Sequence, residues 1–176
     1  MTRRVLWHGV LRNHYHEKIL EKTAELIRKI DGSENDMFFD IVRFLEIKLP
    51  SIDSNFNFRV LPQDEMGECH GITYPDRNEI QIRQDVYDRA IAGSGRDRLT
   101  LAHELGHLLF HEKQNISYAR VGDNTGIVVF RDPEWQADAF GGEVLMLKEV
   151  IKGHNVKEVM NLCKVSEKAA LCQLSK

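Results

Sequence analysis

The stretch LTLAHELGHLLFH, residues 99–111, places two histidines and a glutamate inside an otherwise apolar run. Residues four apart share one face of a helix, so His103 and His107 point the same way, with Glu104 one position further round. Polar groups left unpaired among leucines would each cost about 1–3 kcal/mol, and a zinc ion bound by two neutral imidazoles would offset that cost. H-E-x-x-H on a helix is the zincin arrangement, in which the histidines bind zinc and the glutamate acts on water. The pattern therefore predicts a zinc site, against the alternative of two core histidines that satisfy each other.

A catalytic zinc site needs a third protein ligand. Glu134 and Asp138 lie four apart in DPEWQADAF, where Asp132 and Pro133 are suited to begin a helix. Their shared face predicts one carboxylate on zinc and a second that orients a ligand histidine through its other ring nitrogen. A first-turn glutamate also suits the helix dipole without any metal, and that alternative stays open at this point. His111, one turn further along the first helix, is expected to line the cleft or to cap the helix.

Length and composition limit the kinds of protein that the chain can be. Its 176 residues are enough for one domain with its own core and few for two. A net charge of −3 gives no electrostatic reason to expect direct nucleic-acid binding. Three cysteines without a C-x-x-C pair indicate a reducing compartment rather than a disulfide framework. We recognise no signal peptide and no run of the length of a membrane span, so we expect a cytoplasmic protein without a membrane partner.

Hydrophobic periodicity predicts helices, then a small sheet, then helices, which is the α+β class. The expected helices cover residues 14–30, 36–49, 97–112, 133–151, 155–163 and 167–175, and the expected strands cover 56–62, 70–74 and 79–83. We group these elements into one metallopeptidase domain over residues 1–176, made of N-terminal helices (1–50), a small mixed or antiparallel sheet (56–83), zinc-site helices (97–151) and a C-terminal helix pair (155–176). Gly106 costs about 1 kcal/mol against alanine inside a helix, so it predicts a close approach of another backbone.

Two segments, RDRLTLAHELGHLLFH and PEWQADAFGGEVLM, resemble the ImmA/IrrE family of zinc metallo-endopeptidases. The 27 residues between His107 and Glu134 (134 − 107) are typical of that family, and the resemblance is clearest from about residue 71 to 147. It implies a zincin-like fold and one Zn²⁺ per chain, held by His103, His107 and Glu134. It also implies Glu104 as the general base and Asp138 behind the ligand glutamate. The family often reads Leu-Met-Pro after the second helix; this chain reads Leu-Met-Leu at 145–147, so we expect that helix to run on towards residue 150.

The resemblance implies a zinc endopeptidase that cleaves a regulatory protein. The implied substrate is a helix-turn-helix transcriptional repressor of a prophage or mobile element, or a stress-response repressor. One alternative is a non-catalytic interaction module, or a toxin–antitoxin component, that binds a DNA-binding regulator without cutting it. Another is a DNA-binding regulator that uses the C-terminal helix pair, although packing is the simpler role for that pair without a basic recognition face.

Other residues are candidates for work on the substrate. Tyr118, His111 and His70 could each donate a hydrogen bond to the oxyanion that peptide hydrolysis forms, and the sequence does not choose among them. The strand Glu79, Ile80, Gln81 and Ile82 precedes the active helix and is a candidate sheet edge. Such an edge could bind an extended peptide as an added strand, or it could simply be covered.

Overall fold

The elements follow one another as helices, a small sheet and helices again, so the α+β class is confirmed. The computed structural model describes residues 14–111 and 133–176. Before the sheet come α2 (His14–Asp31), α3 (Ile41–Arg43), the π-helical segment η1 (Phe44–Lys48) and α4 (Leu49–Ile52). Around the sheet lie β1 (Asn57–Leu61), α5 (Gln63–Met66), β2 (Gly71–Tyr74), β3 (Glu79–Arg83) and α6 (Gln84–Ile91). The remaining elements are α7 (Gly95–Phe110), α8 (Pro133–Leu145), α9 (Lys148–Ile151), α10 (Val156–Cys163) and α11 (Glu167–Leu174).

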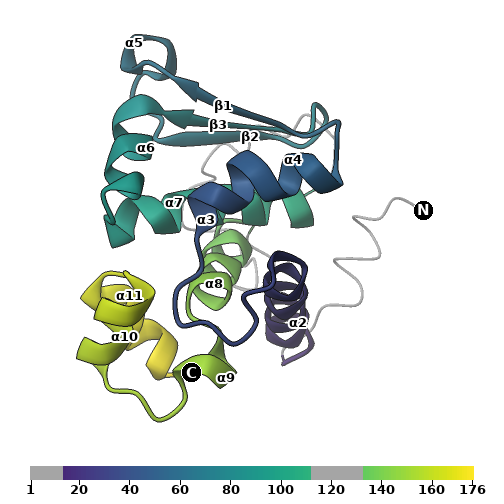
Figure 1. The fold of residues 1–176 in the computed structure, drawn as a ribbon. Coiled ribbons are helices and arrows are strands. Elements are labelled where there is room, and N and C mark those ends of the chain that lie inside the picture. The colour runs from purple at the N-terminus through teal and green to yellow at the C-terminus, as the bar shows by residue number, and fades with distance from the viewer. Residues whose placement is uncertain (1–13, 112–132) are drawn as a thin grey trace, which may run out of the picture.

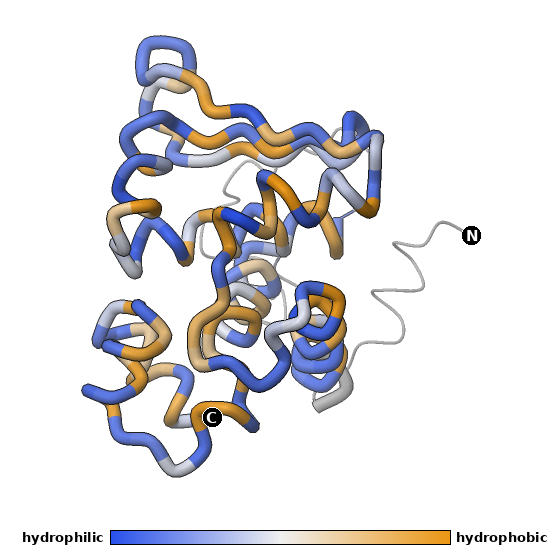
Figure 2. The backbone as a smooth tube through the Cα atoms, viewed as in Figure 1, coloured by the Kyte–Doolittle hydropathy of each residue, from blue (hydrophilic) through white to orange (hydrophobic). Residues whose placement is uncertain are grey.

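Helix α7 lies between the sheet and α8. Figure 1 shows the sheet on top, α7 beneath it, and α8 further down with α2 on one side and the C-terminal helices on the other. Hydrophobic and hydrophilic residues alternate along the strands (Figure 2), the period that turns one face of a sheet toward a core. Ile80 and Ile82 of β3 are completely buried, as are Leu101 and Leu105 of α7. Within the two described ranges, no helix has the length and apolar character that crossing a bilayer requires.

The strand expected at a sheet edge is the central strand. β3 pairs in parallel with β1 and antiparallel with β2, giving the order β1–β3–β2. The expectation that Glu79, Ile80, Gln81 and Ile82 form an edge is therefore wrong. A tight turn over residues 75–78 folds β3 back against β2, and the other side of β3 takes β1. Alternating isoleucines mark an edge and a centre equally, because in both places one face is buried.

The second expected helix, 36–49, begins later and runs further than the sequence indicated. Asp40 caps α3 by accepting a hydrogen bond from the backbone N–H of Arg43 at 3.1 Å. At the other end, the N–H of Leu49 bonds to the carbonyl of Phe44, five residues back. In this π-helical register Pro50, which has no N–H to donate, lies in the first turn of α4 and does not end the helix.

The helix expected over 133–151 is two helices, so the expectation that it runs on is wrong. Leu147, with φ −57° and ψ 125°, leaves the helical region and stands before α9. Side chains from elsewhere satisfy the last carbonyls of α8. Arg28 donates to the carbonyl of Val144 at 3.2 Å, and Gln173 donates to the carbonyl two residues further on at 3.2 Å. These bonds replace those that a continued helix would have formed, and no proline is needed to end it.

Two short helices have no counterpart in the sequence prediction, whereas the C-terminal pair does. These helices are α5 and α6. α6 begins directly after β3, and its N-cap residue Arg83 makes no capping hydrogen bond through its side chain, so the sequence contains no capping residue that marks the start of the helix. α10 and α11 fall within the expected ranges, and Ser166 caps α11 as its sequence context suggests. α11 packs against α8 and α9, which gives the pair a packing role.

Buried Arg28 joins α2 to the loop after it and to the end of α8. Its side chain is completely buried and donates to the carbonyls of Ser33 at 3.1 Å, of Asp36, and of Val144. These backbone carbonyls accept hydrogen bonds from the guanidinium and so offset part of the cost of burying its charge. Burial lowers the pKa of Arg28 from its usual value.

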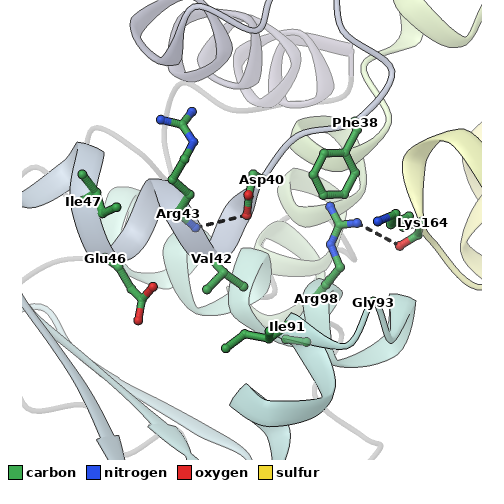
Figure 3. Close-up of a pocket in the computed structure, with 11 residues that line it drawn as sticks. Phe38, Asp40, Val42, Arg43, Glu46, Ile47, Ile91, Gly93, Arg98 and Lys164 are labelled. Carbon is green, nitrogen blue, oxygen red and sulfur yellow. Dashed lines mark hydrogen bonds between the residues drawn. The ribbon is translucent and has the colours of Figure 1, made fainter.

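A second buried arginine, Arg98 of α7, joins three parts of the chain. It donates to the carbonyl of Phe39 at 2.6 Å, of Cys163 at 3.1 Å and of Lys164 at 3.3 Å. Its guanidinium also lies over the Phe38 ring, 4.3 Å from the centroid, on one wall of a pocket of about 430 Å³ (Figure 3). Burial lowers its pKa to about 10, so the side chain stays charged at neutral pH.

We expect Arg98→Met to lower the free energy of unfolding by at least about 3 kcal/mol, because it leaves two buried carbonyls and one part-buried carbonyl without this donor. Urea denaturation followed by circular dichroism measures the change. Arg96→Met is the matched control, since Arg96 lies exposed on the same helix and should change stability by less than about 0.5 kcal/mol. Equal stability of the two variants would contradict the assigned role of Arg98.

Candidate metal centre

Helix α7 carries the H-E-x-x-H residues on two of its faces. Ser94 caps the helix, and its hydroxyl accepts a hydrogen bond from the backbone N–H of Asp97. His103 and His107, one turn apart, are half-buried on the side that meets α8. Glu104 is 7% exposed and faces β2. The helical period thus separates the histidine pair from the glutamate while keeping all three within one turn.

Helix α8 brings two carboxylates to the histidines. The Glu134 carboxylate lies 3.5 Å from Nε2 of His103 and 3.3 Å from Nε2 of His107. Asp138, one turn further along α8, lies 2.6 Å from Nδ1 of His103. The two acids therefore reach opposite sides of the same imidazole, as their spacing of four predicts.

Small residues allow α7 and α8 to approach this closely. A Cβ atom on Gly106 would lie 2.9 Å from the backbone Cα of Ala137, closer than real Cβ contacts. A Cβ atom on Gly141 would lie 3.2 Å from a methyl group of Leu99 and 3.4 Å from the backbone nitrogen of His103. The close approach that Gly106 predicted is therefore confirmed.

The three converging side chains form a donor set that suits a divalent metal. One ligand atom each from His103, His107 and Glu134 can be chosen so that all lie within 4.8 Å of one another. The two Nε2 atoms are 2.8 Å apart, where facing lone pairs repel unless a proton or a metal cation lies between them. Zinc–nitrogen bonds of about 2.0–2.1 Å would place two such atoms about 3.3 Å apart in a tetrahedral site, so a small adjustment accommodates the ion.

The charges of the cluster favour a cation. Burial disfavours protonated His103, but hydrogen bonds to Asp138 and Glu134 outweigh it and raise its pKa to about 10. The hydrogen bonds that Glu134 accepts from His103 and His107 hold the pKa of Glu134 well below its usual range. Carboxylates that favour a proton on an imidazole also favour a metal ion beside it. In the neutral ring that binds a metal, the hydrogen bond from Nδ1–H of His103 to Asp138 leaves the Nε2 lone pair directed at the other two ligand atoms.

Glu104 lies in a cradle that sequence analysis did not predict. The Thr73 hydroxyl is 2.6 Å from Oε2 of Glu104 and 3.0 Å from its backbone oxygen. A Cβ atom on Gly71 would lie 2.7 Å from Cγ of Glu104, so only a glycine leaves room for this side chain. Burial raises the pKa of Glu104, and the Thr73 hydrogen bond acts against that rise. Thr73 is 31 residues from Glu104 in sequence, and no local pattern links the two.

Of the three candidate oxyanion donors, the structure describes His111 and His70. His111 is the C-cap residue of α7, and its ring nitrogens face His107 and Gln136. Both ring nitrogens of His111 therefore have partners inside the protein. His70 precedes β2, and its backbone carbonyl accepts from the N–H of Arg83. Tyr118 and the N-cap candidate Asp132 lie outside the described residues.

Comparison with known protein families identifies one match. A peptidase M78 family model, described as the IrrE N-terminal-like domain, matches residues 75–175. That segment contains α7 and α8 with all three converging side chains, and it covers more than half of the chain. No curated protein matches the chain.

We expect the purified chain, after reconstitution with zinc, to hold about one zinc ion, and His107→Ala and Glu134→Ala to hold much less. Each substitution removes one of three converging donors, and a zinc site closed by fewer protein ligands binds far more weakly. Elemental analysis after dialysis measures the metal content. Glu149→Ala, at an exposed position on α9, is the matched control for loss of a carboxylate and should keep its metal. Unchanged metal content in both site variants would exclude this cluster as the site.

Proposed function

Because the chain belongs to the peptidase M78 family with an IrrE N-terminal-like domain, we propose that it is a zinc endopeptidase that cleaves a regulatory protein. The observation that carries the proposal is the convergence of His103, His107 and Glu134 beside a buried glutamate on the same helix. These three side chains would hold one zinc ion, with Asp138 orienting His103. We further propose that residues 1–176 act as one metallopeptidase domain in the cytoplasm.

Zinc held by two imidazoles and one carboxylate would supply Lewis acidity toward a carbonyl oxygen and would lower the pKa of water. Glu104 is the proposed general base. It accepts the proton of the attacking water on its carboxylate and then transfers that proton to the nitrogen of the leaving amine, so hydrolysis of one peptide bond restores the carboxylate. The raised pKa of Glu104 suits both steps, because burial makes the carboxylate a stronger base.

Thr73 and Gly71 would position this base. The Thr73 hydroxyl holds Oε2, which leaves Oε1 as the oxygen for proton transfer. Gly71 provides the space in which the side chain lies. Both residues belong to β2, the strand that contacts α7 and that pairs on only one side within the described sheet. An extended substrate segment could add to that unpaired side, so β2 replaces β3 as the strand proposed to align a peptide.

The proposed substrate is a helix-turn-helix repressor of a prophage or mobile element, or of a stress response. This part of the proposal follows from the resemblance of the active-site segments to the ImmA/IrrE family. A non-catalytic module, or a toxin–antitoxin component, would bind the same kind of regulator through the same scaffold without cutting it. The two functions differ in whether Glu104 has any effect, since only hydrolysis needs a base.

We expect the zinc-loaded chain to cleave a helix-turn-helix repressor encoded beside its own gene, and Glu104→Gln to abolish cleavage while retaining zinc. Glutamine keeps the size of glutamate but cannot accept the proton. Gel electrophoresis and mass spectrometry of the products measure cleavage, and elemental analysis measures metal. Glu158→Gln, exposed on α10, is the control for an amide substitution far from the site. Binding of the repressor by wild type and Glu104→Gln alike, with no cleavage by either, would support the interaction module instead.

We expect Thr73→Val to lower kcat about tenfold or more with little change in KM, because valine keeps the shape of threonine but cannot hold the Glu104 carboxylate. Thr73→Ser, which retains the hydroxyl, should keep most of the activity. Steady-state kinetics on a cleaved peptide measure both constants. A Thr73→Val enzyme as active as wild type would exclude the positioning role.

A further inference from the structure

The second ligand histidine has a partner of its own, as the first does in Asp138. Nδ1 of His107 lies 2.8 Å from Nδ1 of His111, and Nε2 of His111 lies 3.2 Å from Oε1 of Gln136. Gln136 belongs to α8 and is 2% exposed. The His107 and His111 rings are tilted at 49° with centroids 4.8 Å apart, so they meet through their nitrogens and are not stacked. A continuous chain of polar contacts thus runs from the metal cluster into the interface between α7 and α8.

The direction of each hydrogen bond in this series of contacts follows from the contact at Gln136. The Gln136 oxygen can only accept, so Nε2 of His111 must carry the hydrogen. Two ring nitrogens 2.8 Å apart can share only one hydrogen, and a neutral imidazole that carries its hydrogen on Nε2 has none on Nδ1. Nδ1 of His111 therefore accepts, and Nδ1–H of His107 donates to it. The Nε2 atom of His107 is then left with a lone pair, and that atom points at His103 and Glu134.

We propose that His111 and Gln136 form a positioning relay that holds His107 in the tautomer and orientation a metal ligand needs. The inference rests on the proposed metal centre and deepens it. Each ligand histidine then has a hydrogen-bond acceptor on the nitrogen away from the metal: a carboxylate for His103, and a neutral imidazole backed by a buried amide for His107. Such partners orient the ring and raise its basicity, and their loss typically costs about 10–100-fold in metal affinity.

His111→Phe and His111→Asn separate this role from simple packing. Phenylalanine keeps an aromatic ring but offers no acceptor to His107. Asparagine is smaller, yet its Oδ1 occupies the same position along the side chain as Nδ1 of histidine and accepts a hydrogen bond. We expect zinc to bind about 10–100-fold more weakly to His111→Phe, and His111→Asn to recover most of that loss. A residue needed only for packing would give the opposite order.

Gln136 provides a second test. Gln136→Leu removes the acceptor for Nε2–H of His111, and we expect it to weaken zinc binding less than His111→Phe does, because the relay is broken one step further from the metal. Gln136→Glu keeps an acceptor oxygen and should bind zinc about as well as wild type. In the double variant His111→Phe/Gln136→Leu, the second substitution should have no further effect, since the two residues act in one chain.

The experiment is zinc titration of the full chain against a chromophoric chelator, for wild type and each variant, with circular dichroism to show that each is folded. Nuclear magnetic resonance of ¹⁵N-labelled histidine in the zinc-loaded wild type gives the tautomers directly. The expected tautomers are Nε2–H for His111 and Nδ1–H for His107. Equal zinc affinity of His111→Phe and wild type, or Nδ1–H on His111, would overturn the relay while leaving the metal centre in place. Failure of the wild type itself to bind zinc would overturn the centre and the relay together.

Discussion

The close contact between α7 and α8 is the constraint on which the rest of the site depends. Gly106 meets the backbone of Ala137, and Gly141 meets the backbone of His103, so side chains are absent where the helices touch. At such a distance, carboxylates on one helix reach imidazoles on the other without long side chains having to bend. The polar residues of the H-E-x-x-H helix are therefore placed by two positions that carry no side chain at all.

Burial has different consequences for the members of the site. Glu104 is enclosed by β2, and burial destabilises its carboxylate and raises its pKa, although the hydrogen bond from Thr73 acts in the opposite direction. Glu134 is mostly exposed and lies against two imidazoles, which stabilises its charge. Two glutamates in one small site thus have pKa values moved in opposite directions. This separation suits the different proposed tasks of accepting a proton and binding a cation.

Local periodicity predicted which of the candidate site residues share one face of a helix. The spacings between His103 and His107, and between Glu134 and Asp138, are single helical turns, and the structure brings both pairs together. Contacts between distant segments left no such signal. Thr73 reaches Glu104 across 31 residues, and the central position of β3 depends on which strands flank it, which alternation does not encode. The end of α8 could not be predicted from local pattern either, because it depends on hydrogen bonds that Arg28 and other distant side chains donate to backbone carbonyls there.

The contacts of β2 and of Arg28 also cross the boundary of the segment that the family model matches. The family match begins at residue 75, yet Gly71 and Thr73, which enclose the proposed base, lie just before it. Arg28, further upstream, donates to the last turn of α8 inside the matched segment. A fragment cut at residue 75 would contain every proposed metal ligand and still lack the groups that orient Glu104 and complete α8. In this family member, the segment that the family model matches is shorter than the part of the chain that contacts Glu104 and the end of α8.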